Sequence, residues 1–257
     1  MCFEQLSYVT KLVSQTTRHH KIVGEWDLKR QQLYMQLYDF PGLIEAYKNA
    51  LKVPYKNTNI KLVEKVPRLR LANACEATVG NLYAMAEVAS QFANRISSGR
   101  LPASFNALQK KVDSARVEQT LVDQLGDLQW YRKVREMRTE WVHYSTIFIC
   151  ENDSNEPMVS VRAYRRPSDK LEIPSQTQYL ITEVSEWIQK AIATLDAYAC
   201  YLLNQYVLPS LDKDQVVTIP KYDEKGFPIV LEGGGFDVEQ ITIEEYLRRG
   251  RIGVVTP

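Results

Sequence analysis

The sequence predicts a mainly α-helical protein in which four or more helices pack as an antiparallel bundle. First, apolar residues recur at spacings of three or four positions over three segments of roughly 30 residues each. Second, β-branched runs interrupt this helical pattern at only two places, near residues 145–166 and after residue 210. Several amphipathic rods bury their apolar stripes most simply against one another, and this predicts the bundle.

The composition is that of an ordinary globular chain. Of the 257 residues, 45% are hydrophobic and 25% are charged, and the formal net charge is +1. This balance argues against bulk-charge binding to nucleic acid or membranes, although it is compatible with a local basic site. No apolar run reaches the roughly 20 residues of a membrane helix, and the N-terminal stretch does not resemble a secretory signal. We therefore expect a cytoplasmic protein with no membrane association.

The cysteines and histidines have no metal-site spacing. No C-x-x-C pair occurs among the four cysteines, and the three histidines complete no zinc pattern with them. The cysteines also lack an obvious histidine–carboxylate set, so we expect buried free thiols in a reducing compartment. These residues are Cys2, Cys75, Cys150 and Cys200. We expect no metal and no cofactor.

Three long helices are predicted from the apolar spacing. The first begins with Pro67 as its first helical residue and ends near Ser97. The second covers about residues 115–143. The third begins with Ser175 as its N-cap and continues to about Tyr206, shortly before a proline. Together they form the main body of the predicted bundle.

A further helical region is predicted near the N-terminus. Residues 25–38 and 42–52 both have helical spacing, but the sequence DFPG lies between them. Because this tetrapeptide combines a proline with a glycine, we expect a kink or two helices there. Residues 3–14 are expected to form another short helix.

Two hairpins are predicted outside the helices. The runs STIFIC and MVSVRAYRR flank the turn ENDSNEP, which predicts a hairpin at about 145–166, inserted in a helical domain of residues 1–209. Residues 216–220 and 229–235 predict a second hairpin. A capping box at Thr242 then opens a short helix that Gly250 ends. Residues 210–257 are therefore expected to form a small α/β appendage.

The segment REMRTEWVHY, residues 135–144, ends the second long helix. Helical spacing places one set of its side chains toward the core, namely Met137, Trp141 and Tyr144, together with the preceding Val134. The opposite set comprises Arg135, Arg138, Thr139, Val142 and His143. Arg138 and His143 lie about 140° apart around such a helix. They converge only if the helix ends or bends between them, or if a second molecule supplies one partner.

The run from Arg138 to His143, R-x4-H at the end of a bundle helix, resembles the signature of the HEPN superfamily (higher eukaryotes and prokaryotes nucleotide-binding). The preceding WYRKVREMR, the sequence VHY and the following hairpin resemble a bacterial HEPN-like group. The resemblance covers about residues 67–206. It implies a bundle of four or more helices that commonly dimerises. Many family members are metal-independent ribonucleases, often of toxin or defence systems, and others are inactive binding or scaffolding modules.

The resemblance implies a role for each residue of the motif. Metal-free RNA cleavage needs an acid or base, which His143 supplies, and a fixed cation for phosphate charge, which Arg138 supplies. Arg135 and Tyr144 are expected to support binding, with Thr139 beside them. One chain offers one such histidine, so the site is expected at the interface of a homodimer. Expected partners are RNA or a nucleotide, and an antitoxin or a nucleotidyltransferase.

Three alternatives stay open on the sequence. Cations near a helix end complement the helix dipole, which explains the motif without chemistry. The family usually places Asn, Asp or His directly after the arginine, where Thr139 stands, and this favours a catalytically inactive interaction or nucleotide/RNA-binding module. Glu140 and His143 also form an E-x-x-H, the spacing of di-iron bundle proteins, but no second copy of it occurs in the chain.

Overall fold

Helices make up most of the structure, a computed structural model that describes residues 20–52, 61–143, 147–162, 176–221 and 229–252. The prediction of a mainly α-helical protein is confirmed. Within these ranges the helices are accompanied by two small antiparallel sheets. The short helix expected at residues 3–14 lies outside the described residues.

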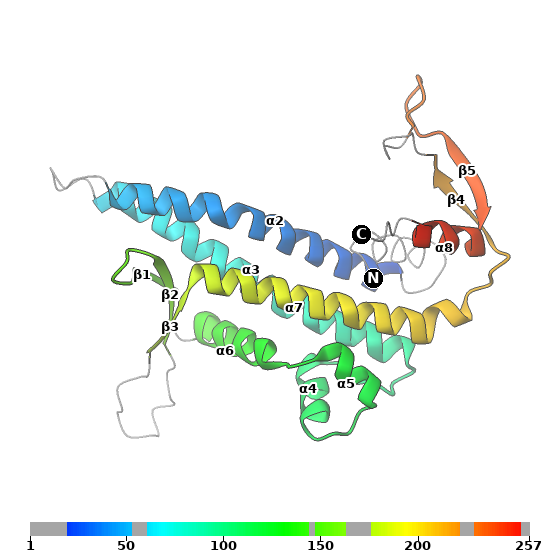
Figure 1. Cartoon of the computed structure of the whole chain (residues 1–257), viewed down its shortest axis with the longest axis horizontal. Coiled ribbons are helices and arrows are strands. Elements are labelled where there is room, and N and C mark those ends of the chain that lie inside the picture. The colour runs from blue at the N-terminus through cyan, green and yellow to red at the C-terminus, as the bar shows by residue number, and fades with distance from the viewer. Residues whose placement is uncertain (1–19, 53–60, 144–146, 163–175, 222–228, 253–257) are drawn as a thin grey trace.

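Three long helices form the body of the molecule: α2 (His20–Leu51), α3 (Lys61–Ile96) and α7 (Ile181–Leu202). Helix α3 returns antiparallel to α2, and α7 lies alongside both (Figure 1). Their facing stripes are closed to solvent, since Leu33, Leu82 and Leu195 are each 0% exposed. The apolar spacing of the sequence thus identifies the surfaces that these helices bury.

Helix α2 is continuous through Pro41, so two separate helices at DFPG, one of the two expected outcomes, was wrong. Proline lacks the N–H that would bond to the carbonyl of Leu37, which disfavours a helix interior. However, the residues on both sides are buried in the main core: Phe40 is 1% exposed and Tyr47 is 0% exposed. Packing against the neighbouring helices on both sides of the proline outweighs the lost bond. Pro67 is likewise inside α3 rather than at its first position.

The second predicted helix is divided into shorter ones. After α4 (Phe105–Asp113) come α5 (Gln119–Leu125) and α6 (Gln129–His143), so a continuous helix over residues 115–143 was wrong. Gly126 ends α5 with φ 56° and ψ −146°, a backbone conformation that essentially only glycine adopts. The break allows Leu125 and Leu128, on either side of the glycine, to be buried in the same core.

Substitution of Gly126 by alanine is expected to destabilise the fold by about 1–3 kcal/mol, because a Cβ strains this backbone conformation. Gly80, inside α3, is the matched control: a Cβ there would meet nothing within 4 Å. Gly80→Ala is expected to be neutral or to stabilise the protein by up to about 1 kcal/mol. Urea unfolding of both variants measures the difference, and equal effects would contradict the assigned conformation.

A three-stranded sheet follows α6. Strands β1 (Phe148–Glu151) and β2 (Pro157–Arg162) form the hairpin expected at residues 145–166, with Ile149 opposite Val159. Strand β3 (Gln176–Leu180) then pairs with β2. The third long helix therefore begins at Ile181 rather than after an N-cap at Ser175, and that expectation was wrong. Pairing with β2 holds this segment extended, and the Glu183 carboxylate accepts the Leu180 N–H at 3.3 Å.

Polar contacts tie this sheet to α2 and α3. The hydroxyl of Tyr47 donates to the Glu151 carboxylate, and Arg68 Nη2 donates to the same carboxylate at 3.2 Å. Lys48 Nζ lies 2.6 Å from Glu156 Oε2 in the hairpin. The sheet therefore has a defined position on the bundle, close to the C-terminal end of α6 (Figure 1).

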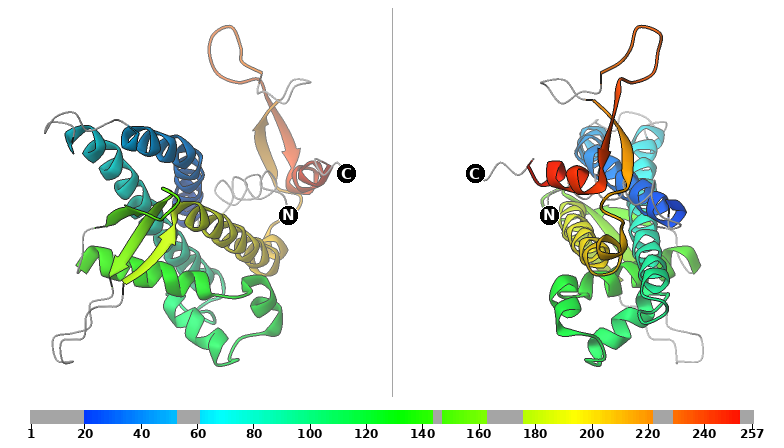
Figure 2. Two further views of the ribbon diagram at one scale, coloured as in Figure 1. Left: turned by 60° about the vertical axis from the view of Figure 1, so that its left-hand side comes forward. Right: turned by 90° about the vertical axis from the view of Figure 1, so that its right-hand side faces the viewer.

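The C-terminal elements form a small unit with its own core. A π-helix, η2 (Leu203–Val207), and a 3-10 turn, η3 (Leu208–Ser210), end α7. Strands β4 (Val216–Pro220) and β5 (Val238–Thr242) then pair, followed by α8 (Ile243–Ile252). Their separate apolar cluster consists of Val217, Ile219, Ile243 and Tyr246. The two strands stand out from the helices in Figure 2.

Two expectations for this unit were wrong in detail. Strand β4 pairs with β5 instead of with residues 229–235. Of that run, Ile229 donates its N–H to the carbonyl of Lys221, just after β4, at 2.9 Å, and the chain then turns back on itself: the N–H of Leu231 donates to Gly235 O at 3.1 Å. Gly250 lies inside α8 instead of ending it. The expected start is confirmed, since Thr242 Oγ1 accepts the N–H of Glu245 at 3.2 Å.

Candidate functional site on helix α6

Helix α6 carries most of the predicted site. Asp127 Oδ1 accepts the N–H of Gln129 at 2.9 Å and fixes where the helix starts. Its core face is the predicted one: Val134, Met137 and Trp141 are 0%, 2% and 6% exposed. Tyr144, expected on the same face, lies outside the described residues. The amphipathic pattern of α6 therefore leaves its arginines on the remaining surface.

Arg138 packs against α3. Its guanidinium carbon lies 4.5 Å from the centroid of the Tyr83 ring, a cation–π contact. Tyr83 in turn stacks on Tyr131 of α6, with ring centroids 5.9 Å apart and an interplanar angle of 16°. The Tyr131 hydroxyl donates to Glu87 Oε1 at 2.9 Å. The pKa of Tyr131 is raised mainly by burial and, second, by this hydrogen bond. Its hydroxyl therefore stays protonated and remains a donor.

No described carboxylate neutralises the charge of Arg138. Among the described residues no carboxylate lies within salt-bridge distance of it, whereas Arg132 on the same helix pairs with Asp113 at 2.8 Å. The side chain is half-buried. A guanidinium held flat on a ring keeps its N–H groups for an oxygen ligand, and phosphate fits their fork.

The supporting residues have local roles in the protomer. Arg135 is exposed and donates from Nη1 to Asn106 Oδ1 of α4. The Thr139 hydroxyl donates to the carbonyl of Arg135 at 2.7 Å, a back-bond within the helix. Neither contact joins Arg135 or Thr139 to Arg138. Of the predicted supporting residues, the two that the structure describes, Arg135 and Thr139, therefore form their hydrogen bonds with groups other than Arg138.

His143 is the last residue of α6, and its side chain lies outside the described part of the chain. The helix is continuous from Arg138 to His143, so the two positions are separated by about 140° around the axis. The helix does not end between them. Of the routes considered from the sequence, a bend within α6 or a second molecule remains to bring Arg138 and His143 to the same ligand.

The chain offers no competing metal or thiol chemistry in the ranges described. No group of three histidine, cysteine, aspartate or glutamate side chains is arranged to hold a metal there. The Glu140 side chain lies outside those ranges, so the E-x-x-H alternative is untested. Burial raises the pKa of the Cys75 thiol to about 12 and that of Cys200 to about 11. These thiols are protonated at neutral pH and are poor nucleophiles.

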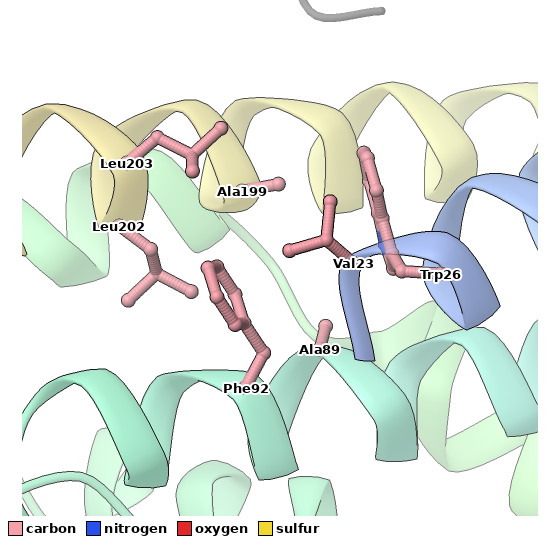
Figure 3. Close-up of a pocket in the computed structure, with 7 residues that line it drawn as sticks. All are labelled: Val23, Trp26, Ala89, Phe92, Ala199, Leu202 and Leu203. Atoms are coloured by element: carbon pink, nitrogen blue, oxygen red, sulfur yellow. The ribbon is translucent and has the colours of Figure 1, made fainter. Parts of the chain in front are cut away.

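Described residues line at least three hollows, and two of them lie in the main helical body. One, between α2, α3 and α7, has a free volume of about 10 Å³ and only apolar walls, to which Val23, Phe92 and Leu202 contribute (Figure 3). It is too small and too apolar for chemistry. The other, about 370 Å³, lies where Lys133 Nζ is 5.9 Å from the Tyr179 ring and 5.8 Å from the Trp187 ring. Aromatic rings thus position a second cation of α6.

Sequence reasoning missed the aromatic support of Arg138. Tyr83 is adjacent to the core residue Leu82, and no spacing rule assigns it to Arg138, which is 55 residues later. The one signal in the sequence was the spacing of four residues between Tyr83 and Glu87, which places them on the same face of a helix. In the structure, Tyr131 contacts both of these residues.

Comparison with known proteins returned no match to a family model, to a curated protein or to a solved structure. In the described residues, no helix is both long and apolar enough to cross a membrane.

Proposed function

We propose that this chain is a HEPN-like helical protein that binds RNA at α6 and cleaves it, without a metal, as a homodimer. The observation that supports the proposal is Arg138: it is half-buried, stacked on Tyr83 at 4.5 Å and not paired with a carboxylate in the described structure. Most structural arginines are either paired or fully solvated. A preorganised, un-neutralised guanidinium is suited to stabilise charge on a phosphate.

Catalysis requires a group that takes or gives a proton. Imidazole titrates near neutral pH and suits this task, and His143 is the histidine on the same helix. Because the helix separates the two positions, the proposed site combines Arg138 of one copy with His143 of the other. A two-fold axis then generates two such sites per dimer. An antitoxin or nucleotidyltransferase partner is proposed from the family resemblance alone.

The activity test uses a single-stranded RNA incubated with purified protein in the presence of EDTA. His143→Ala is expected to slow cleavage by about 10²–10⁴-fold, the usual contribution of a general acid or base. Arg138→Ala is expected to have an effect of similar size, and Arg138→Lys to recover only part of it. The control is Arg70→Ala, an exposed arginine of α3. Cleavage that is equally fast in all variants would contradict the proposal.

The shared site has its own test. An equal mixture of Arg138→Ala and His143→Ala protomers, allowed to exchange subunits, forms one intact composite site in each mixed dimer. About half of the dimers are mixed, so the mixture is expected to recover about a quarter of the wild-type rate. No recovery despite verified subunit exchange would place both residues in one protomer or in no site.

A binding module without catalysis is the second candidate, and one contact favours it. The Thr139 hydroxyl is engaged by the carbonyl of Arg135 at 2.7 Å, at the position where the family that the motif resembles usually carries Asn, Asp or His. A mobility-shift assay on the same RNA distinguishes the two candidates. Binding that depends on Arg138, without cleavage at any pH between about 5 and 8, identifies the inactive module.

A further inference from the structure

Helices α4 and α5 lie near the N-terminal end of α6 and beside the C-terminal part of α7 (Figure 1). Residues of α4, α5, α7 and η2 line a groove there. Its free volume is about 420 Å³, within the size range of small-molecule sites. We call it the α4–α5 groove. Its charged and aromatic walls are Arg100, Lys111, Arg116, Glu118, Tyr201 and Tyr206.

The groove is electropositive. Arg100, Lys111 and Arg116 line it, and none of them forms a salt bridge with a described residue. Glu118 is the single acidic side chain of the lining, and the Tyr201 hydroxyl donates to its Oε2 at 3.4 Å. Elsewhere in the structure, cations such as Lys48, Arg68 and Arg132 are paired with carboxylates. Three cations around one hollow, none of them paired with a described carboxylate, favour an anion.

Local backbone geometry holds two of these cations at the groove. Helix α4 ends at Ser114, and Ala115 adopts φ 52°, the left-handed conformation that closes a helix. The N–H of Arg116 then donates to the carbonyl of Lys111 at 2.8 Å. This hydrogen bond holds the backbone of Arg116 next to that of Lys111 at the end of α4. Both side chains line the groove.

The opposite wall is aromatic. Tyr201 is at the end of α7, and Tyr206 is in the π-helix η2; both are half-buried. A π-helix closes its hydrogen bonds over five residues, so it turns Tyr206 toward the side of Tyr201, and such segments are frequent at functional sites. Burial raises the pKa of Tyr206, as do Tyr201 and Glu118, while Arg100 lowers it. All four groups are therefore close neighbours.

We propose that the α4–α5 groove binds a nucleotide, with Arg100, Lys111 and Arg116 on its phosphates and the base against Tyr201 and Tyr206. Arginine and lysine donate to phosphate oxygens, and a planar base stacks on tyrosine whatever its identity. The ligand is either a free nucleotide or the 5′-phosphorylated end of an RNA strand, which share this chemistry. The site is separate from Arg138 and His143 and does not depend on their function.

Isothermal titration of the chain of residues 1–257 tests the groove with four probes: ADP, adenosine, pyrophosphate and a 5′-phosphorylated oligoribonucleotide. ADP is expected to bind at least about tenfold more tightly than adenosine or pyrophosphate, because only ADP uses both walls. Binding of the oligoribonucleotide but not of ADP by the Arg138→Ala variant, which lacks the cation of the α6 site, would assign the groove to an RNA end. Pyrophosphate binding as tight as that of ADP, or no binding of any probe at millimolar concentration, would overturn the proposal.

Adjacent lysines provide a matched pair of variants. Lys111 lines the groove and Lys110 does not, although both are exposed in the last turn of α4. Lys111→Ala is expected to weaken ADP or oligoribonucleotide binding about tenfold, and Lys110→Ala to leave it unchanged. Equal effects would overturn the proposal. Arg138→Ala is expected to bind ADP like the wild type, so failure here and failure of the α6 site are distinguishable. Thermal melts verify that each variant is folded.

Discussion

Arg30→Ala is expected to lower the free energy of unfolding by about 3–5 kcal/mol, the usual consequence of removing one partner from a buried ion pair. The Arg30 side chain is 0% exposed, and its Nε lies 2.9 Å and 3.0 Å from the two carboxylate oxygens of Asp196. Its guanidinium also lies 5.7 Å from the Trp26 ring and 5.6 Å from the Tyr34 ring. The pair joins α2 to α7, so alanine leaves a carboxylate desolvated between two bundle helices.

The loss in Arg30→Ala is expected to depend on pH. Burial raises the pKa of Asp196, and Arg30 is the group that lowers it; Asp27 raises it further. Without Arg30 this pKa is higher still, so the folded variant binds a proton that the unfolded chain releases. Its stability relative to the wild type therefore rises as pH falls through the range above the ordinary aspartate pKa, and the deficit is largest at neutral pH.

Urea unfolding across pH measures this effect, with Arg70→Ala as the exposed control. The double variant Arg30→Met with Asp196→Leu is expected to be more stable than Arg30→Ala, since two apolar side chains leave no unpaired charge at that contact. A small, pH-independent change in Arg30→Ala, equal to that of Arg70→Ala, would show that the contact contributes little.

Phe105→Ala is expected to destabilise the protein by a similar amount, about 3–5 kcal/mol, because it opens a cavity in the main core. Phe105 is 0% exposed at the start of α4. Its ring centroid lies 4.6 Å from that of Tyr131, 5.6 Å from Trp130 and 6.4 Å from Tyr198. One ring therefore joins α4 to α6 and α7, and its loss leaves three aromatic neighbours without a contact.

The matched control is Phe236→Ala, since Phe236 is 53% exposed in the C-terminal unit. Its effect is expected to stay within about 0.5 kcal/mol. Phe105→Leu, which fills part of the cavity, should fall between the two alanine variants. The midpoint of urea unfolding measures all three, and the assigned role of Phe105 would be wrong if both alanine variants unfolded at the same midpoint.

Helical periodicity predicted the burial of α6 accurately because it depends on local geometry alone. Val134, Met137 and Trp141 form the core face that their spacing indicated. The same rule misplaced helix boundaries where tertiary contacts compete with local preference. Pro41 lies within a helix because both flanks pack on the core, and the residues before Ile181 form a strand because β2 is available to pair with them.

The candidate sites, like the helix boundaries, were predicted from the sequence only where they depend on a single helix. The sequence supplied Arg138 and His143 as a pair on one helix, but not the Tyr83 ring beneath Arg138, which comes from another helix. It gave no indication of the α4–α5 groove, because Arg100, Lys111 and Tyr206 belong to different elements. Only packing brings such residues to one place, and no periodicity within a single element encodes it.

The sequence by itself therefore determined the helical class, the buried stripes of the long helices and the position of the hairpin after α6. These follow from local hydrogen bonding and from the alternation of apolar and polar residues. The tertiary structure decided that α2 continues through Pro41, where the predicted helix over 115–143 is broken, and which side chains surround Arg138 and Arg30. Those outcomes depend on free-energy differences between contacts of residues far apart in the chain, which local patterns do not contain.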